Sequence, residues 1–280
     1  MPYAPSQMID YGRYPIDQEG PKRDILLNRV RADLERDGCA VIKQFLTAGG
    51  IAALAAEADS VSDKGHRSFN RTNVYFSKVD PSLPADDPRR QFFDRSNAFV
   101  PADNLPKDGP LRTIHDSQGF DRFIQDCLQE NEFYRYADPL ADVIVNMAEA
   151  GNGFPWHFDT NNFTVTLAIQ NANQGGAFEY APGIREGDEN FAEVSRVLCG
   201  ISNKVKVLNL EPGDLQIFRG RYSLHRVAPL SGPRRRYVAI FSYVGEPNMV
   251  GTPERAKQLY GRALPIHYER AGQRADSYLD

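Results

Sequence analysis

Short β-rich segments separated by glycine and proline turns fill the second half of this 280-residue chain, and they constrain its fold most strongly. Seven such runs lie between residues 143 and 243, among them VIVNMAEAG, FTVTLAIQNA and RYVAIFSY. Many short strands at this spacing are typical of an all-β sandwich or barrel. The pattern therefore predicts a mainly β fold with flanking helices, built on a double-sheet jelly roll.

The first half of the chain carries helix signals instead. Apolar residues at helical spacing after Pro21 predict a helix that ends at Gly38, and a strand is predicted for residues 39–45. Residues 62–110 are predicted to form long loops with one short strand at 73–76. Further helices are predicted for residues 47–60, 120–128, 187–199 (in part) and 253–260.

These signals predict one domain over residues 1–280, with a helical N-terminal layer packed on the jelly roll. The expected parts are an extended arm (1–20), a helical and loop layer (21–135), the jelly-roll core (136–262) and a tail (263–280).

The composition narrows the class of partner. Lys plus Arg is 33 and Asp plus Glu is 37, so the net charge of −4 lacks the basic excess of a nucleic-acid-binding protein. No stretch approaches the roughly 20 apolar residues of a membrane-spanning helix. The first 20 residues lack the apolar region of a signal peptide, and the three cysteines form no CxxC pair. We expect a cytoplasmic protein with a small-molecule substrate, bound to neither nucleic acid nor membrane.

A His-x-Asp motif lies in this β-rich region. Residues two apart in a strand point to the same face, so His157 and Asp159 are aimed at one point. A second histidine, His225, lies in another strand-like run, SLHRV. Two neutral imidazoles and one carboxylate form the facial triad that binds Fe(II) in non-haem oxygenases and leaves positions open for a cosubstrate and O2. The alternative reading is a strand-end histidine beside an aspartate in a turn.

A basic run follows the distal histidine. Strand alternation in RRRYVAIFSY places Arg236, Val238, Ile240 and Ser242 on one face. A buried arginine among apolar neighbours needs an anion, and the distal carboxylate of 2-oxoglutarate would supply it. Arg236 is the first candidate because it is nearest the apolar run. Arg234 has the same parity and is the alternative, and all three arginines could instead be solvated.

Together these segments resemble the Fe(II)/2-oxoglutarate-dependent oxygenases. The strings GFPWHFDTNNFTVTLAIQ, GDLQIFRGRYSLHRV and RRRYVAIFSY are similar, more narrowly, to the clade of radical halogenases and hydroxylases that act on free amino acids. The resemblance covers roughly residues 70–262. It implies a double-stranded β-helix core, a non-haem dioxygenase, and the use of Fe(II), 2-oxoglutarate and O2 with release of succinate and CO2.

One position divides the chemistries of that clade. Its halogenases carry Gly or Ala where its hydroxylases carry the carboxylate ligand, because halide needs that coordination site. Asp159 occupies this position, so the resemblance implies hydroxylation and no native halogenation.

The resemblance also suggests where the substrate binds. An arginine upstream of the core binds the amino acid carboxylate in the clade, and Arg95 falls at that place, although it could be a surface residue. Lysine-acting members have an acidic residue just after the metal-binding tripeptide, whereas this chain has Thr160. This departure favours a neutral, aliphatic amino acid, oxidised by hydroxylation, desaturation or cyclisation. Ser242 is a further candidate for the pocket wall.

Three other functions fit parts of the sequence. A cupin-type metal enzyme would not use 2-oxoglutarate and would leave Arg236 without an anion. A non-catalytic β-sandwich would bind no stoichiometric metal. An oxygenase acting on a carrier-tethered or non-amino-acid metabolite would give Arg95 no free carboxylate to bind. Residues 183–200 could form a lid, and the remaining histidines, His66, His115 and His267, are expected at the surface.

Overall fold

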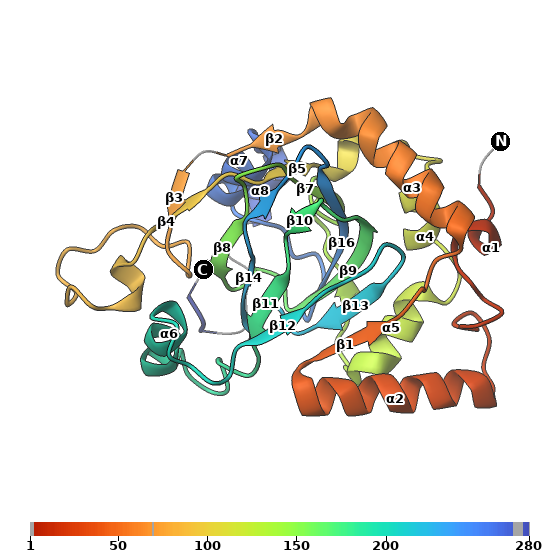
Figure 1. The fold of residues 1–280 in the computed structure, drawn as a ribbon, viewed down its shortest axis with the longest axis horizontal. Helices are drawn as coiled ribbons and strands as arrows, with labels where there is room; N and C mark the ends of the chain where they lie inside the picture. The colour runs from red at the N-terminus through yellow and green to blue at the C-terminus, as the bar shows by residue number, and fades with distance from the viewer. Residues whose placement is uncertain (1–2, 69, 271–276, 280) are drawn as a thin grey trace.

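The computed structural model describes residues 3–68, 70–270 and 277–279, and its centre is a pair of facing antiparallel sheets (Figure 1). The larger sheet has eight strands in the order β1-β13-β9-β16-β7-β5-β2, with β6 paired to β16. Its strands are β1 (Cys39–Ile42), β2 (His66–Arg67), β5 (Ala98–Val100), β6 (Tyr134–Arg135), β7 (Val143–Ala148), β9 (Phe163–Gln170), β13 (Leu215–Phe218) and β16 (Arg236–Val244).

The smaller sheet has four strands in the order β12-β11-β14-β8, and two short ribbons, β3-β4 and β10-β15, accompany it. This two-sheet arrangement is the double-stranded β-helix that the strand pattern predicts. The strands are β3 (Asn70–Thr72), β4 (Phe93–Arg95), β8 (Phe154–His157), β10 (Gln174–Gly175), β11 (Phe178–Ala181), β12 (Lys206–Leu208), β14 (Leu224–Val227) and β15 (Leu230–Ser231).

The helices between residues 5 and 128 cover the larger sheet on the side away from the smaller one (Figure 1). The predicted helix boundaries hold where local signals are strong: Gly38 ends α2 in the left-handed conformation at φ 65°, and the Thr47 hydroxyl caps α3. The helices are α1 (Pro5–Met8), α2 (Pro21–Asp37), α3 (Ala48–Val61), α4 (Pro110–His115), α5 (Phe120–Leu128), α6 (Phe191–Leu198), α7 (Pro253–Tyr260) and α8 (Pro265–Arg270), with short 3₁₀ turns η1 (Ser62–Lys64), η2 (Pro88–Arg90) and η3 (Ala102–Asn104).

Strand alternation divides the side chains of the larger sheet between two environments. On β16, Tyr237, Ala239 and Phe241 point outward and pack in the main core with apolar residues of α2, α3 and α5. Arg236 and Val238 point the other way and line a cavity between the two sheets. The outer face of the larger sheet therefore packs against the helices, and its inner face lines the cavity between the two sheets.

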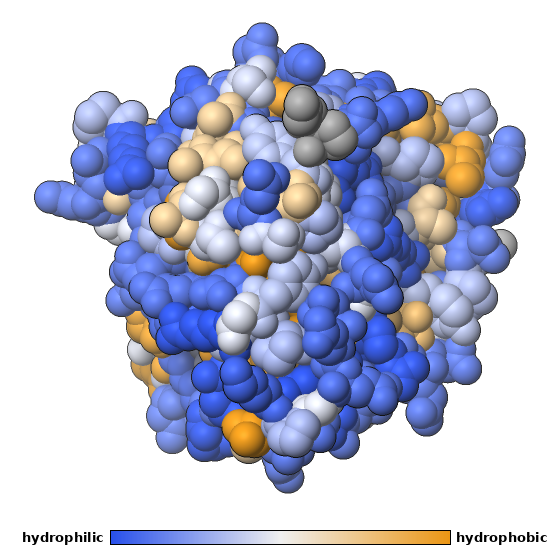
Figure 2. All heavy atoms as spheres, turned by 90° about the vertical axis from the view of Figure 1, so that its right-hand side faces the viewer, coloured by the Kyte–Doolittle hydropathy of each residue, from blue (hydrophilic) through white to orange (hydrophobic). Residues whose placement is uncertain are grey.

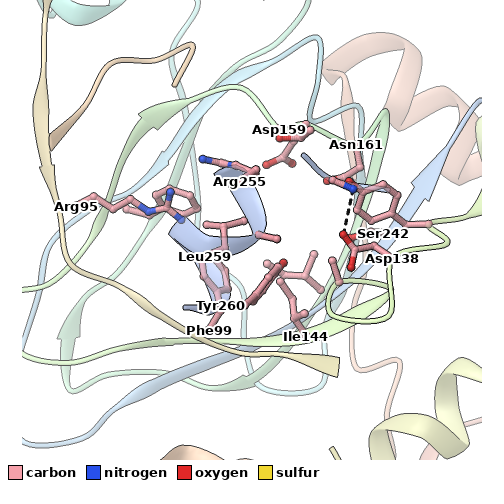
Figure 3. Close-up of a pocket in the computed structure, with 17 residues that line it drawn as sticks. Arg95, Phe99, Asp138, Ile144, Asp159, Asn161, Ser242, Arg255, Leu259 and Tyr260 are labelled. Atoms are coloured by element: carbon pink, nitrogen blue, oxygen red, sulfur yellow. Dashed lines mark hydrogen bonds between the residues drawn. The ribbon is translucent and has the colours of Figure 1, made fainter. Parts of the chain in front are cut away.

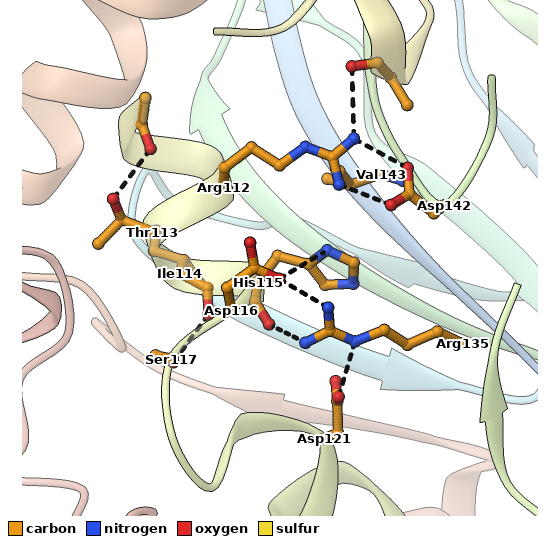
Figure 4. A network of polar contacts seen from close by, with 12 residues as sticks. Arg112, Thr113, Ile114, His115, Asp116, Ser117, Asp121, Arg135, Asp142 and Val143 are labelled. Atoms are coloured by element: carbon orange, nitrogen blue, oxygen red, sulfur yellow. Dashed lines mark hydrogen bonds and ion pairs between the residues drawn. The ribbon is translucent and has the colours of Figure 1, made fainter. Parts of the chain in front are cut away.

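Charged side chains fasten the helical layer to the end of the sheet. Arg135 of β6 pairs with Asp116 at 2.6 Å and Asp121 at 2.7 Å, and it also donates to the carbonyl of His115 (Figure 4). Arg112 of α4 pairs with Asp142, just before β7, at 2.6 Å. These contacts hold the ends of α4 and α5 against the strands that form the inner cavity.

The outer surface of the helical layer is polar. The face of the molecule on the right of Figure 1 is mostly hydrophilic, with hydrophobic residues in small separate patches (Figure 2). Among the described residues, no helix is long and apolar enough to cross a membrane.

The structure corrects several expectations for the first 135 residues. The predicted extended arm contains the helical turn α1, and Met8, Ile9 and Ile16 in it are buried. Residues 73–76 form a turn and not a strand. Besides β1, which the sequence predicted, the layer at 21–135 also contributes β2, β5 and β6 to the larger sheet. Of the predicted tail, residues 265–270 form α8, and residues 271–276 and 280 lie outside the described part.

Candidate metal centre

Two histidines face each other across neighbouring strands of the smaller sheet. His157 of β8 and His225 of β14 are direct partners in the antiparallel register. Asp159 follows β8 by two residues, and its Oδ1 lies 3.5 Å from His157 Nε2 and 3.4 Å from His225 Nε2. Within the described residues, this is the one group of three or more His, Cys, Asp or Glu side chains that could hold a metal ion. The predicted triad is therefore assembled.

Backbone carbonyls fix the orientation of both imidazole rings. His157 Nδ1 lies 2.8 Å from the carbonyl oxygen of Pro155, and His225 Nδ1 lies 2.8 Å from that of Ser223. A carbonyl only accepts, so each Nδ1 carries the proton and each Nε2 presents its lone pair to the shared point. Burial, followed by the neighbouring His225, lowers the pKa of His157 to about 3, which keeps the ring neutral as a metal ligand.

Hydrogen bonds fix both the backbone and the side chain of Asp159. The backbone N–H of Asp159 donates to the carbonyl of Gly220 at 3.1 Å, and the hydroxyl of Thr164 donates to Oδ2 at 2.5 Å. Gly220 has a steric role, because a Cβ at this position would lie 2.1 Å from Asp159 Oδ2. The remaining oxygen, Oδ1, faces the two histidines.

A cavity between the two sheets begins at this triad and ends at Arg236. The Arg236 side chain is buried, and no carboxylate among the described residues pairs with it. Burial lowers the pKa of Arg236 to about 10, so the guanidinium remains charged at neutral pH. Arg234 is exposed, and its guanidinium donates to Gln170 at 3.4 Å. Of the two predicted candidates, the structure places Arg236 in the cavity and Arg234 outside it.

A second cavity lies on the other side of the triad (Figure 3). It shares Phe154, Asp159 and Ile240 with the first cavity. Three further residues predicted for substrate binding line it, namely Arg95, Thr160 and Ser242.

Arg95 is a buried cation with no counter-charge among the described residues. It is 1% exposed, its Nε donates to Asn97 at 3.2 Å, and its two terminal nitrogens have no hydrogen-bond partner in the described part of the chain. Its guanidinium lies 4.4 Å from the ring centroid of Phe154. Burial, followed by repulsion from Arg255, lowers the pKa of Arg95 well below its ordinary value. Arg95 is therefore not the surface residue that the sequence left possible.

Several other residues that line these cavities were not predicted from the sequence. Arg255 of α7 lines the second cavity, and its guanidinium lies over the ring of Phe76 at 3.5 Å from the centroid. Asn146, Thr166 and Gln216 line the first cavity. Asn146, Thr166 and Gln216 could have been found from the sequence, because each is a polar residue at an inward-facing position of a buried strand. Arg255 could not, because it lies on a helix whose position depends on tertiary packing.

Two of the histidines expected at the surface are buried. His267 Nδ1 accepts the backbone N–H of Leu264, so Nε2 carries the proton and donates to Asp138 at 3.0 Å, which ties α8 to the loop between β6 and β7. His115 packs against Phe241. Neither lies with the triad.

A family model describes almost the whole chain. The model for halogenase D matches residues 22–259. The chain belongs to the halogenase D family. No curated protein sequence matches it.

Several solved structures share the fold of this chain at low sequence identity. The epimerase SnoN, in complex with Fe3+, alpha ketoglutarate and nogalamycin RO, is 16% identical, with a TM-score of 0.58 over 90% of this chain and 93% of that one. A prolyl hydroxylase from Trichoplax adhaerens is 17% identical (TM-score 0.53; 80% and 91% covered). A 2OG-Fe(II) oxygenase family oxidoreductase from Burkholderia pseudomallei is 14% identical (TM-score 0.51; 83% and 96% covered).

Family, fold and triad together define the enzyme class. The protein is a non-haem Fe(II)/2-oxoglutarate-dependent oxygenase, with a His-Asp-His facial triad. The residues present suit these cofactors, because two neutral imidazoles and a carboxylate converge at one point and an unpaired buried cation ends the cavity beside them. A cupin-type enzyme without 2-oxoglutarate and a non-catalytic module are thereby excluded.

The unpaired charge in the first cavity gives a test of cosubstrate binding. We expect Arg236→Met to weaken 2-oxoglutarate binding about 30-fold or more, because removing one partner of a buried ion pair costs about 2–5 kcal/mol. Arg234→Met is the matched control, since it removes an exposed arginine two residues away. Isothermal titration with 2-oxoglutarate under anaerobic conditions measures both. Equal affinities in the two variants would exclude Arg236 as the carboxylate ligand.

Proposed function

We propose that this oxygenase hydroxylates an unactivated C–H bond of a free, neutral, aliphatic amino acid. The observation that carries the proposal is Arg95, a buried guanidinium in the cavity that also contains Asp159, whose two terminal nitrogens find no partner among the described residues. A charge buried in this way requires an anion. A free carboxylate suits it best, because the planar guanidinium binds a carboxylate through two parallel hydrogen bonds.

The remaining charges in the second cavity argue against a cationic substrate side chain. Asp138 already accepts from the backbone N–H groups of Leu140 at 2.9 Å and Gly251 at 3.1 Å, and it also contacts His267. Asp159 is a metal ligand, and Thr160 stands where lysine-acting relatives have an acid. No described carboxylate in this cavity is thus left to pair with a cationic side chain, and the α-ammonium group of the amino acid is assigned to the polar groups of Thr160 and Ser242.

The rest of the wall fits an aliphatic chain. Most of the other lining residues are apolar: Phe99, Ala141, Ile144, Phe154, Ile240, Ala256 and Leu259. Such a surface stabilises hydrocarbon and excludes water from the reacting carbon. Thr160 and Ser242 are the small polar groups of the wall, and we assign them to the polar end of the substrate.

Asp159 determines which reaction of the family we propose. Family membership by itself points to halogenase-type functionalisation of C–H bonds. The Asp159 carboxylate takes the coordination position that halide needs, and Thr164 and the Gly220 backbone hold it there. We therefore propose that this member transfers oxygen and not chlorine.

Each group then has a defined part in the reaction. His157, Asp159 and His225 hold the metal, Arg236 binds the distal carboxylate of 2-oxoglutarate, and Arg95 orients the substrate. When bound, Fe(II), 2-oxoglutarate and O2 supply the oxidising chemistry, with release of succinate and CO2. The two cavities share Phe154, Asp159 and Ile240, so the substrate reaches the metal from the side opposite Arg236. Small changes in its position would select hydroxylation, desaturation or cyclisation.

Aerobic turnover with a panel of free amino acids tests this function. The Fe(II)-loaded protein, in chloride buffer with 2-oxoglutarate, should form succinate only with its substrate, and the product should gain the mass of one oxygen. A loss of two hydrogens would indicate desaturation or cyclisation. Chlorinated product would contradict the role of Asp159. If no free amino acid stimulates succinate formation, the substrate is a carrier-tethered amino acid or another metabolite.

Arg95→Met tests the carboxylate site directly. We expect the KM of the amino acid to rise about 30-fold or more, with iron and 2-oxoglutarate affinities unchanged, because the variant removes one partner of a buried charge pair. Arg71→Met is the control, since Arg71 lies exposed on the neighbouring strand β3. Steady-state kinetics with the amino acid identified by the panel measures the effect. An unchanged KM in Arg95→Met would remove Arg95 from the substrate site.

A further inference from the structure

A third buried arginine lies behind the metal-binding loop, outside both cavities lined by the triad. The Arg185 side chain is fully buried, and its guanidinium lies 3.9 Å from the ring centroid of Phe158. Phe158 is the residue between the ligands His157 and Asp159. A cation over an aromatic face is attractive and most effective when it is removed from water. Arg185 therefore contacts the residue whose displacement would move two of the three ligands.

Arg185 differs from Arg95 and Arg236 because partners within the chain satisfy it. It donates to Glu189 at 2.8 Å, to the carbonyl of Leu279 at 2.9 Å and to the carbonyl of Arg221 at 3.3 Å. Burial lowers the pKa of Arg185, and the Glu189 carboxylate opposes that shift. With its hydrogen bonds matched internally, this cation needs no ligand, so its role lies in holding structure.

Residues 278 and 279 complete the surroundings of Arg185. The backbone N–H of Leu279 donates to the second oxygen of Glu189 at 2.6 Å, so Leu279 is bonded to both members of the ion pair. The N–H of Gly187 donates to the hydroxyl of Tyr278 at 3.1 Å. These contacts fasten the turn after β11 to a segment about 90 residues later in the sequence.

The same segment also contacts the turn just before β14, the strand that carries His225. Arg221 donates to the carbonyl of Tyr278 at 3.3 Å, and the preceding residue, Gly220, accepts the backbone N–H of Asp159 at 3.1 Å. The Leu279 side chain packs against an apolar cluster that contains the neighbours of all three ligands: Trp156 and Phe158 beside His157 and Asp159, and Leu224 beside His225. Residues 278–279 thus bridge the two segments that present the metal ligands.

We propose that Arg185 is a positioning residue of the metal centre and that residues 278–279 hold it in place. The guanidinium fixes the ring of Phe158, and the ring fixes the spacing between His157 and Asp159. Outer partners of this kind orient metal ligands, and their loss usually weakens metal binding by about 10- to 100-fold. The inference does not depend on the identity of the amino acid substrate.

Iron affinity tests the proposal without any substrate. We expect Arg185→Met, which keeps a side chain over Phe158 but loses the charge and the hydrogen bonds, to weaken Fe(II) binding about 10- to 100-fold. A chain that stops after residue 277 should lose a similar factor. Chelator competition under anaerobic conditions gives the dissociation constant of Fe(II). Arg185→Lys, which retains the charge facing Glu189, should recover part of the loss.

Arg226→Met is the matched control. Arg226 lies over the ring of Trp156 at 4.8 Å and pairs with Glu179 at 2.7 Å, so it makes the same kinds of contact on the other side of His157, but its side chain is 38% exposed and water can replace those contacts. We expect its Fe(II) affinity to stay within about twofold of the parent protein. The melting temperature of each metal-free variant separates general destabilisation from loss of positioning.

A double-mutant comparison tests whether Arg185 and residues 278–279 act as one unit. If they do, Arg185→Met in the shortened chain should bind Fe(II) about as weakly as either single variant, since coupled residues are not additive. Fe(II) affinity unchanged in Arg185→Met would overturn the proposal. So would losses that multiply in the double variant, or an equal loss in Arg226→Met at an equal melting temperature.

Discussion

The direct pairing of His157 with His225 across β8 and β14 is the constraint on which the site depends. Antiparallel register places the two rings side by side, and the carbonyls of Pro155 and Ser223 turn both Nε2 atoms toward one point. Asp159 needs only a short turn after β8 to join them. The jelly roll supplies this geometry because it brings two strands far apart in sequence into one small sheet, facing the polar interior of the larger sheet.

Among the buried arginines around the triad, Arg185, Arg95 and Arg236 show the difference between a structural charge and a ligand-binding charge. Arg185 has its carboxylate and its carbonyl partners within the chain, whereas no described carboxylate pairs with Arg95 or Arg236. A buried cation without a counter-charge is costly to fold, so it indicates an anionic ligand at that position. Arg236 and Arg95 lie in the two cavities on either side of the triad, which matches one anionic cosubstrate and one anionic end of a substrate.

The sequence predicted what local periodicity and spacing encode: the strand ladder, the helix ending at Gly38, the triad and the inward parity of Arg236. It failed where distant contacts decide. Residues 73–76 carry a β-like pattern, but the Asn73 side chain accepts from the N–H groups of Tyr75 and Ser77 and forms a turn. The pairing of β1 with β13 and the position of Arg255 in the second cavity depend on tertiary packing, which local sequence patterns do not predict.

The central claim is that one metal ion sits between the two sheets with a cosubstrate cavity and a substrate cavity on either side. A crystal structure of the protein grown anaerobically with Fe(II) and 2-oxoglutarate, with anomalous data at the iron edge, tests it most directly. We predict one anomalous peak, from an iron ion bound by His157, His225 and Asp159. The distal carboxylate of 2-oxoglutarate should contact Arg236, and the cavity at Arg95 should contain no 2-oxoglutarate. Iron elsewhere, or 2-oxoglutarate bound at Arg95, would contradict it.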